Sequence, residues 1–156
     1  YWIKKMARFI QSKDLAFFEK ISKELVEDVV STAIQFFKLS IAESRTNLYG
    51  ESLNKSYHQG VTINCIIERE DTVTNYEGFG PDTGQNVEFR FNRFTLEEKD
   101  VYPEIGDIVF HNEAYFEISN VREDQLIGGR SGEKFSIIVS TFMTRRSQLN
   151  LESRIV

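Results

Sequence analysis

The sequence predicts an α+β protein in which a long N-terminal helix packs on a small antiparallel β-barrel or sandwich of five to six strands. Three observations lead to this prediction. Apolar residues recur at spacings of three and four across residues 12–44, strand-like alternation recurs in several segments after residue 60, and glycine-containing turns separate those segments. At 156 residues, the chain is expected to form a single domain around one core.

The composition is that of a globular protein, with 40% hydrophobic and 28% charged residues. Thirteen Phe and six Tyr are numerous for this length, and such flat side chains fill cores and protein interfaces. No apolar run approaches the ~20 residues that a membrane-spanning helix needs, so no membrane partner is predicted. The single Cys excludes an internal disulfide framework and favours a reducing compartment.

Charge is distributed unevenly along the chain. Residues 1–60 hold nine Lys/Arg and seven Asp/Glu, residues 61–120 hold four and thirteen, and residues 121–156 hold six and four. An acidic middle between basic ends suits copies that pack side by side, although a solvated acidic face is the simpler alternative. Strong general affinity for DNA is not expected, because phosphate binding needs a concentrated basic patch.

Residues 1–11 are predicted to form an arm that docks on its own domain or on a neighbour, and residues 12–44 a long helix. Ser12 is the expected N-cap, and Asp14 lies in the first turn, where a negative charge suits the helix dipole. The helix carries two adjacent apolar stripes, which is more than one small sheet covers, so two partners are expected. The stripes comprise Phe18, Ile21, Leu25, Val29, Ala33 and Phe36, and beside them Val26, Val30, Ile34, Phe37 and Ile41.

After a region of turns over residues 45–60, residues 61–146 are predicted to form the barrel. The first strand, Val61–Glu68, places alternate apolar residues, including Cys65, on one face. Residues 71–86 contain three glycines and a proline, which predicts a long exposed loop. In the next strand, Val87–Phe94, the last residue falls on the opposite face, which predicts a bulge near Asn92.

A hairpin and a last strand complete the predicted barrel. The hairpin pairs Asp107–His111 with Tyr115–Val121 around a tight corner at Asn112-Glu113. The last strand covers residues 134–145, and residues 147–156 are predicted to be a C-terminal tail.

Candidate catalytic and metal-binding residues are few. Cys65 with His58 and His111 is one possible nucleophile–base set, but a thiol on an apolar strand face behaves as a small buried hydrophobe. The three residues also lack a zinc-like spacing. Glu68, Glu70 and Asp71 offer oxygen ligands to a hard cation without the glycine-pinned spacing of a calcium loop, so exposed charges closing a strand are the preferred interpretation. We therefore predict no catalytic, metal or cofactor site.

The predicted functional residues are instead contacts with other proteins. Phe79 lies among the glycines of residues 78–84, and an exposed aromatic in such a loop is a common interface anchor. The main basic cluster joins Arg130, Arg145 and Arg146 to Lys134 and Arg154, and it suits an acidic protein surface, nucleic acid or solvent. The predicted protein-interface residues are Trp2, Phe79, Arg130, Arg145 and Arg146.

Three segments together resemble a known family. They are AESRTNLYGES (Ala42–Ser52), the acidic strand and loop that follow, and EIGDIVFHNEAYFEISNVREDQLIGG (Glu104–Gly129). Roughly residues 40–132 resemble the neck and head-closure (head–tail connector) proteins of tailed bacteriophages and are similar to the neck protein of T4-like myoviruses. The matching positions of the GDLIxF…LFEIxxV…QxG hairpin are Gly106, Asp107, Ile108, Val109 and Phe110, then Tyr115, Phe116, Glu117, Ile118 and Val121, then Gln125 and Gly128.

The resemblance implies a structural virion protein without enzymatic activity or a cofactor. It implies copies of the chain in a ring, a hexamer or dodecamer, at the junction of head and tail, assembled in the host bacterial cytoplasm. The implied partners are a portal or adaptor ring and tail-terminator or tail proteins, with DNA passing through the lumen without sequence-specific binding. The alternative is a monomeric β-barrel that binds nucleic acid or a peptide, and a third hypothesis is a small hydrolase using Cys65.

Overall fold

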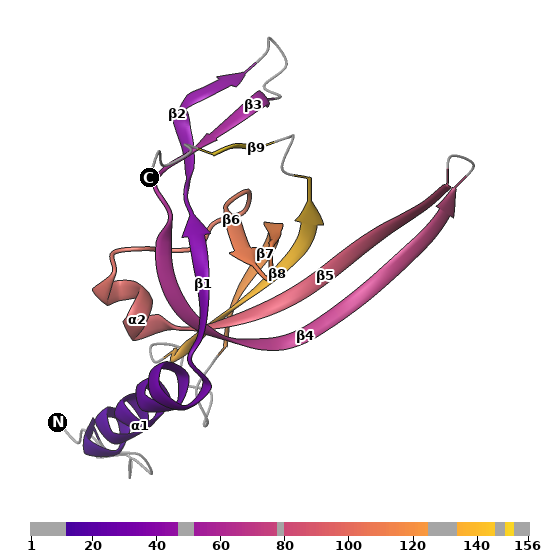
Figure 1. Ribbon diagram of the computed structural model, residues 1–156. Helices are drawn as coiled ribbons and strands as arrows, with labels where there is room; N and C mark the ends of the chain where they lie inside the picture. The colour runs from indigo at the N-terminus through magenta and orange to yellow at the C-terminus, as the bar shows by residue number, and fades with distance from the viewer. Residues whose placement is uncertain (1–11, 47–51, 78–79, 125–133, 146–148, 152–156) are drawn as a thin grey trace, which may run out of the picture.

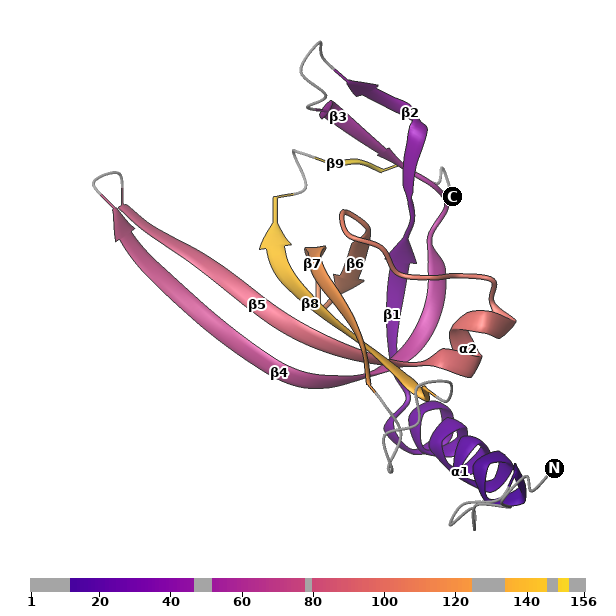
Figure 2. The ribbon, with the colours of Figure 1, turned by 180° about the vertical axis from the view of Figure 1, so that it is seen from behind.

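A computed structural model describes residues 12–46, 52–77, 80–124, 134–145 and 149–151 of the chain. These residues form a helical segment, a closed six-strand barrel and a separate three-stranded sheet (Figure 1). The helix lies at one end of the barrel and the small sheet at the other, while one hairpin projects to the side (Figure 2). The predicted α+β class with a β-barrel is confirmed, and the sheet is a closed barrel.

The helical segment consists of an α-helix and a following π-helical turn, and the strands come after it, interrupted by one short helix. In chain order, the elements are α1 (Ser12–Glu24), η1 (Leu25–Val30), β1 (Thr32–Phe37), β2 (Leu39–Thr46), β3 (Ser52–Tyr57), β4 (Val61–Glu77), β5 (Gly80–Asn92), α2 (Arg93–Glu98), β6 (Ile108–His111), β7 (Ala114–Asp124), β8 (Ser136–Thr144) and β9 (Leu149–Leu151).

The barrel closes because β1 pairs on both of its sides. The strand order is β1-β4-β5-β8-β7-β6, every pair is antiparallel, and β6 returns to β1. On one side, β1 pairs with β4 over residues 32–36. On the other, three residue pairs join the end of β1 to β6, beginning at Gln35↔Phe110. This short β1–β6 seam completes the ring of strands.

In β1 and β5, alternation directs every second side chain into the barrel. In β5, Val87, Phe89 and Phe91 are fully buried, and the ring of Phe89 meets that of Phe116 edge to face at a centroid distance of 6.0 Å. The buried cluster comprises Ile34, Phe36, Ile63, Cys65, Val87, Phe89, Phe91, Leu96, Val109, Phe116, Ile118, Ile137 and Val139.

The helix is shorter than the predicted span of residues 12–44, because it ends at Val30. Ser31 adopts a left-handed φ of 47°, and its N–H donates to the carbonyl of Val26 at 3.0 Å. In β1, Ile34 and Phe36 point into the core, while Gln35 between them is exposed. An alternating segment also contains apolar residues four apart, so both periods fit residues 32–41, and pairing within the barrel favours the strand.

Residues 71–86 form paired strands instead of the predicted long loop. The register runs from Asp71↔Asn86 to Glu77↔Gly80, so two residues separate the strands. Pro81 fits in β5 because β5 pairs with β8 only from Asn86 onward, which leaves the earlier part as an edge among the described strands.

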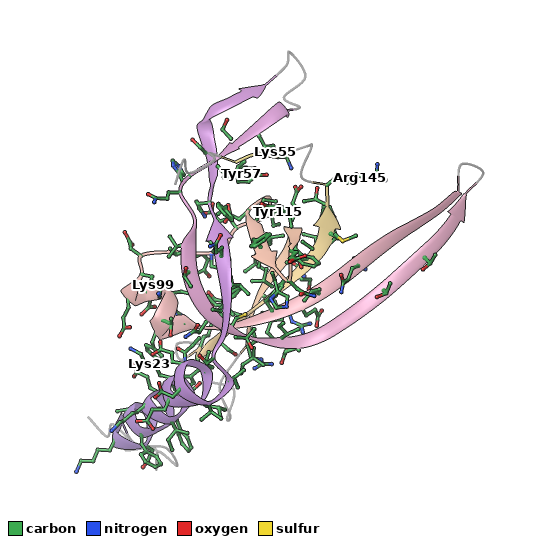
Figure 3. All side chains as sticks on the ribbon, in the orientation of Figure 1. Lys23, Lys55, Tyr57, Lys99, Tyr115 and Arg145 are labelled. Atoms are coloured by element: carbon green, nitrogen blue, oxygen red, sulfur yellow. The ribbon has the colours of Figure 1, made fainter. Side chains whose placement is uncertain are left out.

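The sequence also does not predict the outer sheet of β2, β3 and β9. The supposed turn region, residues 45–60, contains β3, and the supposed tail, residues 147–156, contains β9, which pairs in parallel with β3. Lys55 of β3, labelled in Figure 3, forms an ion pair with Glu117 of β7, which ties this sheet to the barrel. The β3 sequence SLNKSY has only two apolar residues and β9 only three residues in all, so neither shows an alternating period.

The bulge predicted near Asn92 is wrong, because the strand ends there. The Asn92 side chain accepts a hydrogen bond from the N–H of Phe94 at 3.0 Å and caps α2. Phe94 therefore leaves the face of the strand because the chain has become helical. The register shifts of the barrel occur elsewhere, at Glu68 in β4 and at Ser119 in β7.

The β6–β7 hairpin forms as predicted. Asn112 and Glu113 both have positive φ, 47° and 63°, which matches the two-residue turn that suits the twist of paired strands. Before the hairpin, Gly106 has a φ of 95°, a conformation that residues with a Cβ rarely adopt, and this favours glycine at the position.

A buried carboxylate ties together the two sides of the β1–β6 seam. Asp107 immediately precedes β6 and is 1% exposed. Its two oxygens accept the N–H groups of Leu39 and Glu104, each at 2.8 Å, and one oxygen lies 3.2 Å from Nζ of Lys38. Burial raises the pKa of the Asp107 carboxyl, while the two amides and Lys38 oppose that rise. Because Lys38 and Leu39 follow β1 directly, this side chain sets where β1 ends relative to β6.

We expect Asp107→Ala to lower the free energy of unfolding by about 2–4 kcal/mol, because two amides and an ammonium lose their buried acceptor. The matched control is Glu104→Ala, which removes the exposed carboxylate that lies 2.8 Å from the same lysine. Since exposed ion pairs contribute little, we expect this change to cost less than about 0.5 kcal/mol. Urea unfolding followed by circular dichroism measures both, and equal losses would contradict this role of Asp107.

Candidate functional site

Cys65 is buried in the barrel core and is not placed for nucleophilic catalysis. It is 0% exposed, and its neighbours in the buried cluster include Ile63 and Phe89. Burial raises the pKa of the Cys65 thiol to about 12. The thiol therefore remains protonated at neutral pH, as the sequence predicts for a cysteine on an apolar strand face.

The histidines considered with Cys65 have other roles. The backbone N–H of His58 donates to the carbonyl of Lys38 at 2.8 Å, and the exposed His58 side chain lies just beyond β3. The ring of His111 meets that of Phe89 at a centroid distance of 5.9 Å, in an edge-on arrangement. Across the described ranges, no three His, Cys, Asp or Glu side chains are grouped to hold a metal ion.

One of the acidic residues near the β4 register shift forms an ion pair with a residue of the neighbouring strand. Glu68, at the register shift, lies 2.6 Å from the guanidinium of Arg90 on β5. Glu70 and Asp71 continue along β4, in register with Val87 and Asn86. An oxygen already paired with a guanidinium is a poor ligand for a cation, which favours the predicted role of Glu68 as a charge closing a strand.

We expect the Cys65 thiol to resist modification in the folded protein. A pKa of about 12 leaves about one thiol in 10⁴ ionised at pH 8, and the sulfur is enclosed. A chromogenic disulfide reagent at pH 8 should therefore not react with the native protein and should react with one equivalent in guanidinium. Rapid reaction of the native protein would revive the hydrolase hypothesis, for which Cys65→Ser is the direct test.

Two hollows interrupt the surface near the ends of the barrel. One, of about 290 Å³, lies between α1, α2 and the start of β8, and its lining includes Leu15, Arg93 and Phe135. The other, of about 240 Å³, lies beside the β1–β6 seam, and its lining includes His111. Cys65, the nucleophile of the hydrolase hypothesis, is not in the lining of either hollow.

Of the five predicted interface residues, only Arg145 falls in the described part of the chain. It is exposed at the end of β8, on the barrel rim (Figure 3). Trp2, Phe79, Arg130 and Arg146 lie outside the described residues. Lys134, assigned to the same basic cluster, forms an ion pair with Glu123 of β7.

The β4–β5 hairpin projects well beyond the barrel. Over residues 72–77 and 80–85, here termed the arm, β4 and β5 pair with each other and with no third strand among those described. Figures 1 and 2 show the arm as a twisted ribbon that leaves the barrel at an angle. A two-stranded ribbon is only marginally stable in water, which makes the arm a candidate contact surface.

The helix contacts the rest of the chain mainly through polar groups. Ser22 accepts a hydrogen bond from Asn92 at 3.2 Å, Lys23 lies 2.5 Å from Glu98, and Glu27 accepts one from Thr95 at 2.8 Å. Val26 of η1 is buried and adds an apolar contact, whereas six other apolar residues of the helical segment are exposed. This open stripe consists of Phe17, Phe18, Ile21, Leu25, Val29 and Val30.

The open stripe corresponds in part to the apolar stripes seen in the sequence. The sequence predicts two partners for the helix because its apolar period continues through residue 41. The open stripe instead ends at Val30, where the helix ends. Its exposure is visible only in the structure, because the sequence does not show which side of an amphipathic helix its own barrel covers. In the described ranges, no helix is both long and apolar enough to span a membrane.

Comparison with models of known protein families gave no match, and neither did comparison with curated protein sequences.

Proposed function

We propose that this chain is a structural virion protein of the phage neck, which forms a ring between the portal of the DNA-filled head and the tail and helps to close the head. The observation that carries this proposal is the arm. It extends two strands beyond the barrel without a third strand to support them, as expected of an element that is completed by a neighbouring protein.

A ring also needs two different surfaces on each subunit, because head-to-tail contacts join unlike patches. The arm projects from one side of the barrel, while the open stripe of the helix lies at one of its ends (Figure 1). Subunits with such separate contact surfaces can join to a neighbour and to an adjacent ring at once. The resemblance of residues 40–132 to phage neck proteins independently favours this assembly.

The proposed work is mechanical and involves no enzymatic step. Cys65 is protonated and enclosed, and the polar Asp107 site serves to hold the barrel closed. The acidic middle of the sequence suits a lumen that lets DNA pass, since like charges weaken phosphate binding. The contacts with a portal or adaptor ring and with tail proteins belong to the arm and to the predicted interface residues.

We expect the purified chain to bind the portal protein of the same phage and to form a ring on it. An isolated subunit can remain monomeric until its partner templates assembly, so the measurement is made on the mixture. Light scattering and native mass spectrometry should show a complex containing several copies of the chain. A monomer that stays free in the presence of the portal, and instead binds DNA or peptide, would favour the monomeric binding module.

A variant with a shortened arm tests whether the arm is needed for ring assembly while leaving the barrel folded. Thr72 and Gln85 are register partners, so residues 73–84 can be replaced by the tight turn Asn-Gly. We expect the unfolding midpoint of the barrel to change by only a few degrees, because the removed parts of β4 and β5 pair with each other and with no third described strand. Assembly with the portal should be lost. A shortened chain that still forms the ring would remove the arm from the proposal.

A further inference from the structure

The open stripe is an apolar surface at the outer end of the molecule. Val29 is 73% exposed and Phe17 is 60% exposed. Leaving these side chains in water forgoes the free energy that burial provides and promotes non-specific association of free subunits. The buried Val26 and the polar contacts of Ser22, Lys23 and Glu27 already attach the helix to the barrel, so the stripe is not needed for that attachment.

We propose that residues 1–11 of the same chain cover the open stripe in the free subunit. This segment ends where α1 begins, at Ser12, so it is tethered beside the surface that it would cover. Seven of its eleven residues are apolar: Tyr1, Trp2, Ile3, Met6, Ala7, Phe9 and Ile10. A tethered segment acts at an effective concentration in the millimolar range, which favours it over a second copy at ordinary concentrations.

The charges of the two elements are complementary. Residues 1–11 carry Lys4, Lys5 and Arg8 and no acidic residue, whereas residues 12–30 carry five acidic residues and three lysines. Glu24 and Asp28 are exposed in the same turns of the helix as Leu25 and Val29. Basic side chains beside an apolar contact would therefore meet carboxylates.

The length of the segment also suffices. At 1.5 Å per residue, the far end of the stripe at Val29 lies roughly 25 Å from Ser12. Ten extended residues reach about 33 Å, so the segment can reverse direction before Ser12 and run back along the helix. This inference rests on the helix and its charges and does not depend on the proposed neck function.

Trp2 provides a direct measurement, because it is the only tryptophan in the chain. In the monomeric full chain, we expect its fluorescence to be shifted to short wavelength and to be quenched weakly by acrylamide. The double change Phe17→Ser and Ile21→Ser should shift the emission to longer wavelength and raise the quenching constant several-fold. The control is Lys20→Ser, which alters an exposed residue of the same helix and should leave both readings unchanged.

Two further measurements show whether each variant is folded and whether the N-terminal segment is docked. Circular dichroism and an unreactive Cys65 thiol establish that each variant retains the folded barrel. Trypsin cleavage after Lys4, Lys5 and Arg8, followed by mass spectrometry, should be slow in the parent chain and several-fold faster in the double variant, because a docked segment must open before it is cut.

A parent chain whose Trp2 is as accessible as in the unfolded protein would overturn the proposal. So would a Trp2 signal that does not respond to the stripe substitutions. Protection that appears only as the protein dimerises at higher concentration would assign the stripe to a second copy. Ring assembly on the portal is a separate measurement, so either proposal can fail while the other stands.

Discussion

The closure of the barrel depends on one carboxylate at its shortest seam. Three residue pairs join β1 to β6, and Asp107 adds bonds just past that seam, to the N–H of Leu39 after β1 and to Glu104 before β6. Lys38 completes the site and also donates to the carbonyl of Tyr102 at 2.8 Å. Because the bonds join segments far apart in sequence, the carboxylate holds the first strand of the barrel beside the loop that leads into the hairpin.

This site gives a physical reason for the Gly106-Asp107 pair that precedes the β6–β7 hairpin. Gly106 supplies a backbone conformation with φ of 95° beside Leu39, and Asp107 supplies the acceptors. Because Gly106 and Asp107 help to close the barrel, their presence indicates the fold and does not indicate a particular activity. The proposed function therefore rests on what projects from the barrel, namely the arm and the contacts of the helix.

How much the sequence predicts depends on how local each signal is. The β6–β7 hairpin and the alternation of β5 follow from a two-residue turn and a period of two, which are local signals, and they form as predicted. The end of the helix cannot be predicted from local signals. Residues 32–41 fit both the helical and the strand period, and the pairing of β1 with the distant strands β4 and β6 favours the strand. Pro81 and the glycines near it indicate a loop in the sequence, yet an edge position makes them compatible with a strand.

The arm also bears on how free subunits avoid aggregation. Its two strands each leave one row of backbone groups without a described partner, and such edges pair readily with the edges of other copies. The sequence from Glu70 to Gln85 contains four acidic residues and no lysine or arginine. Like charges on both strands oppose the pairing of two arms edge to edge. The acidic residues of the arm therefore oppose fibre-like growth through its exposed strand edges.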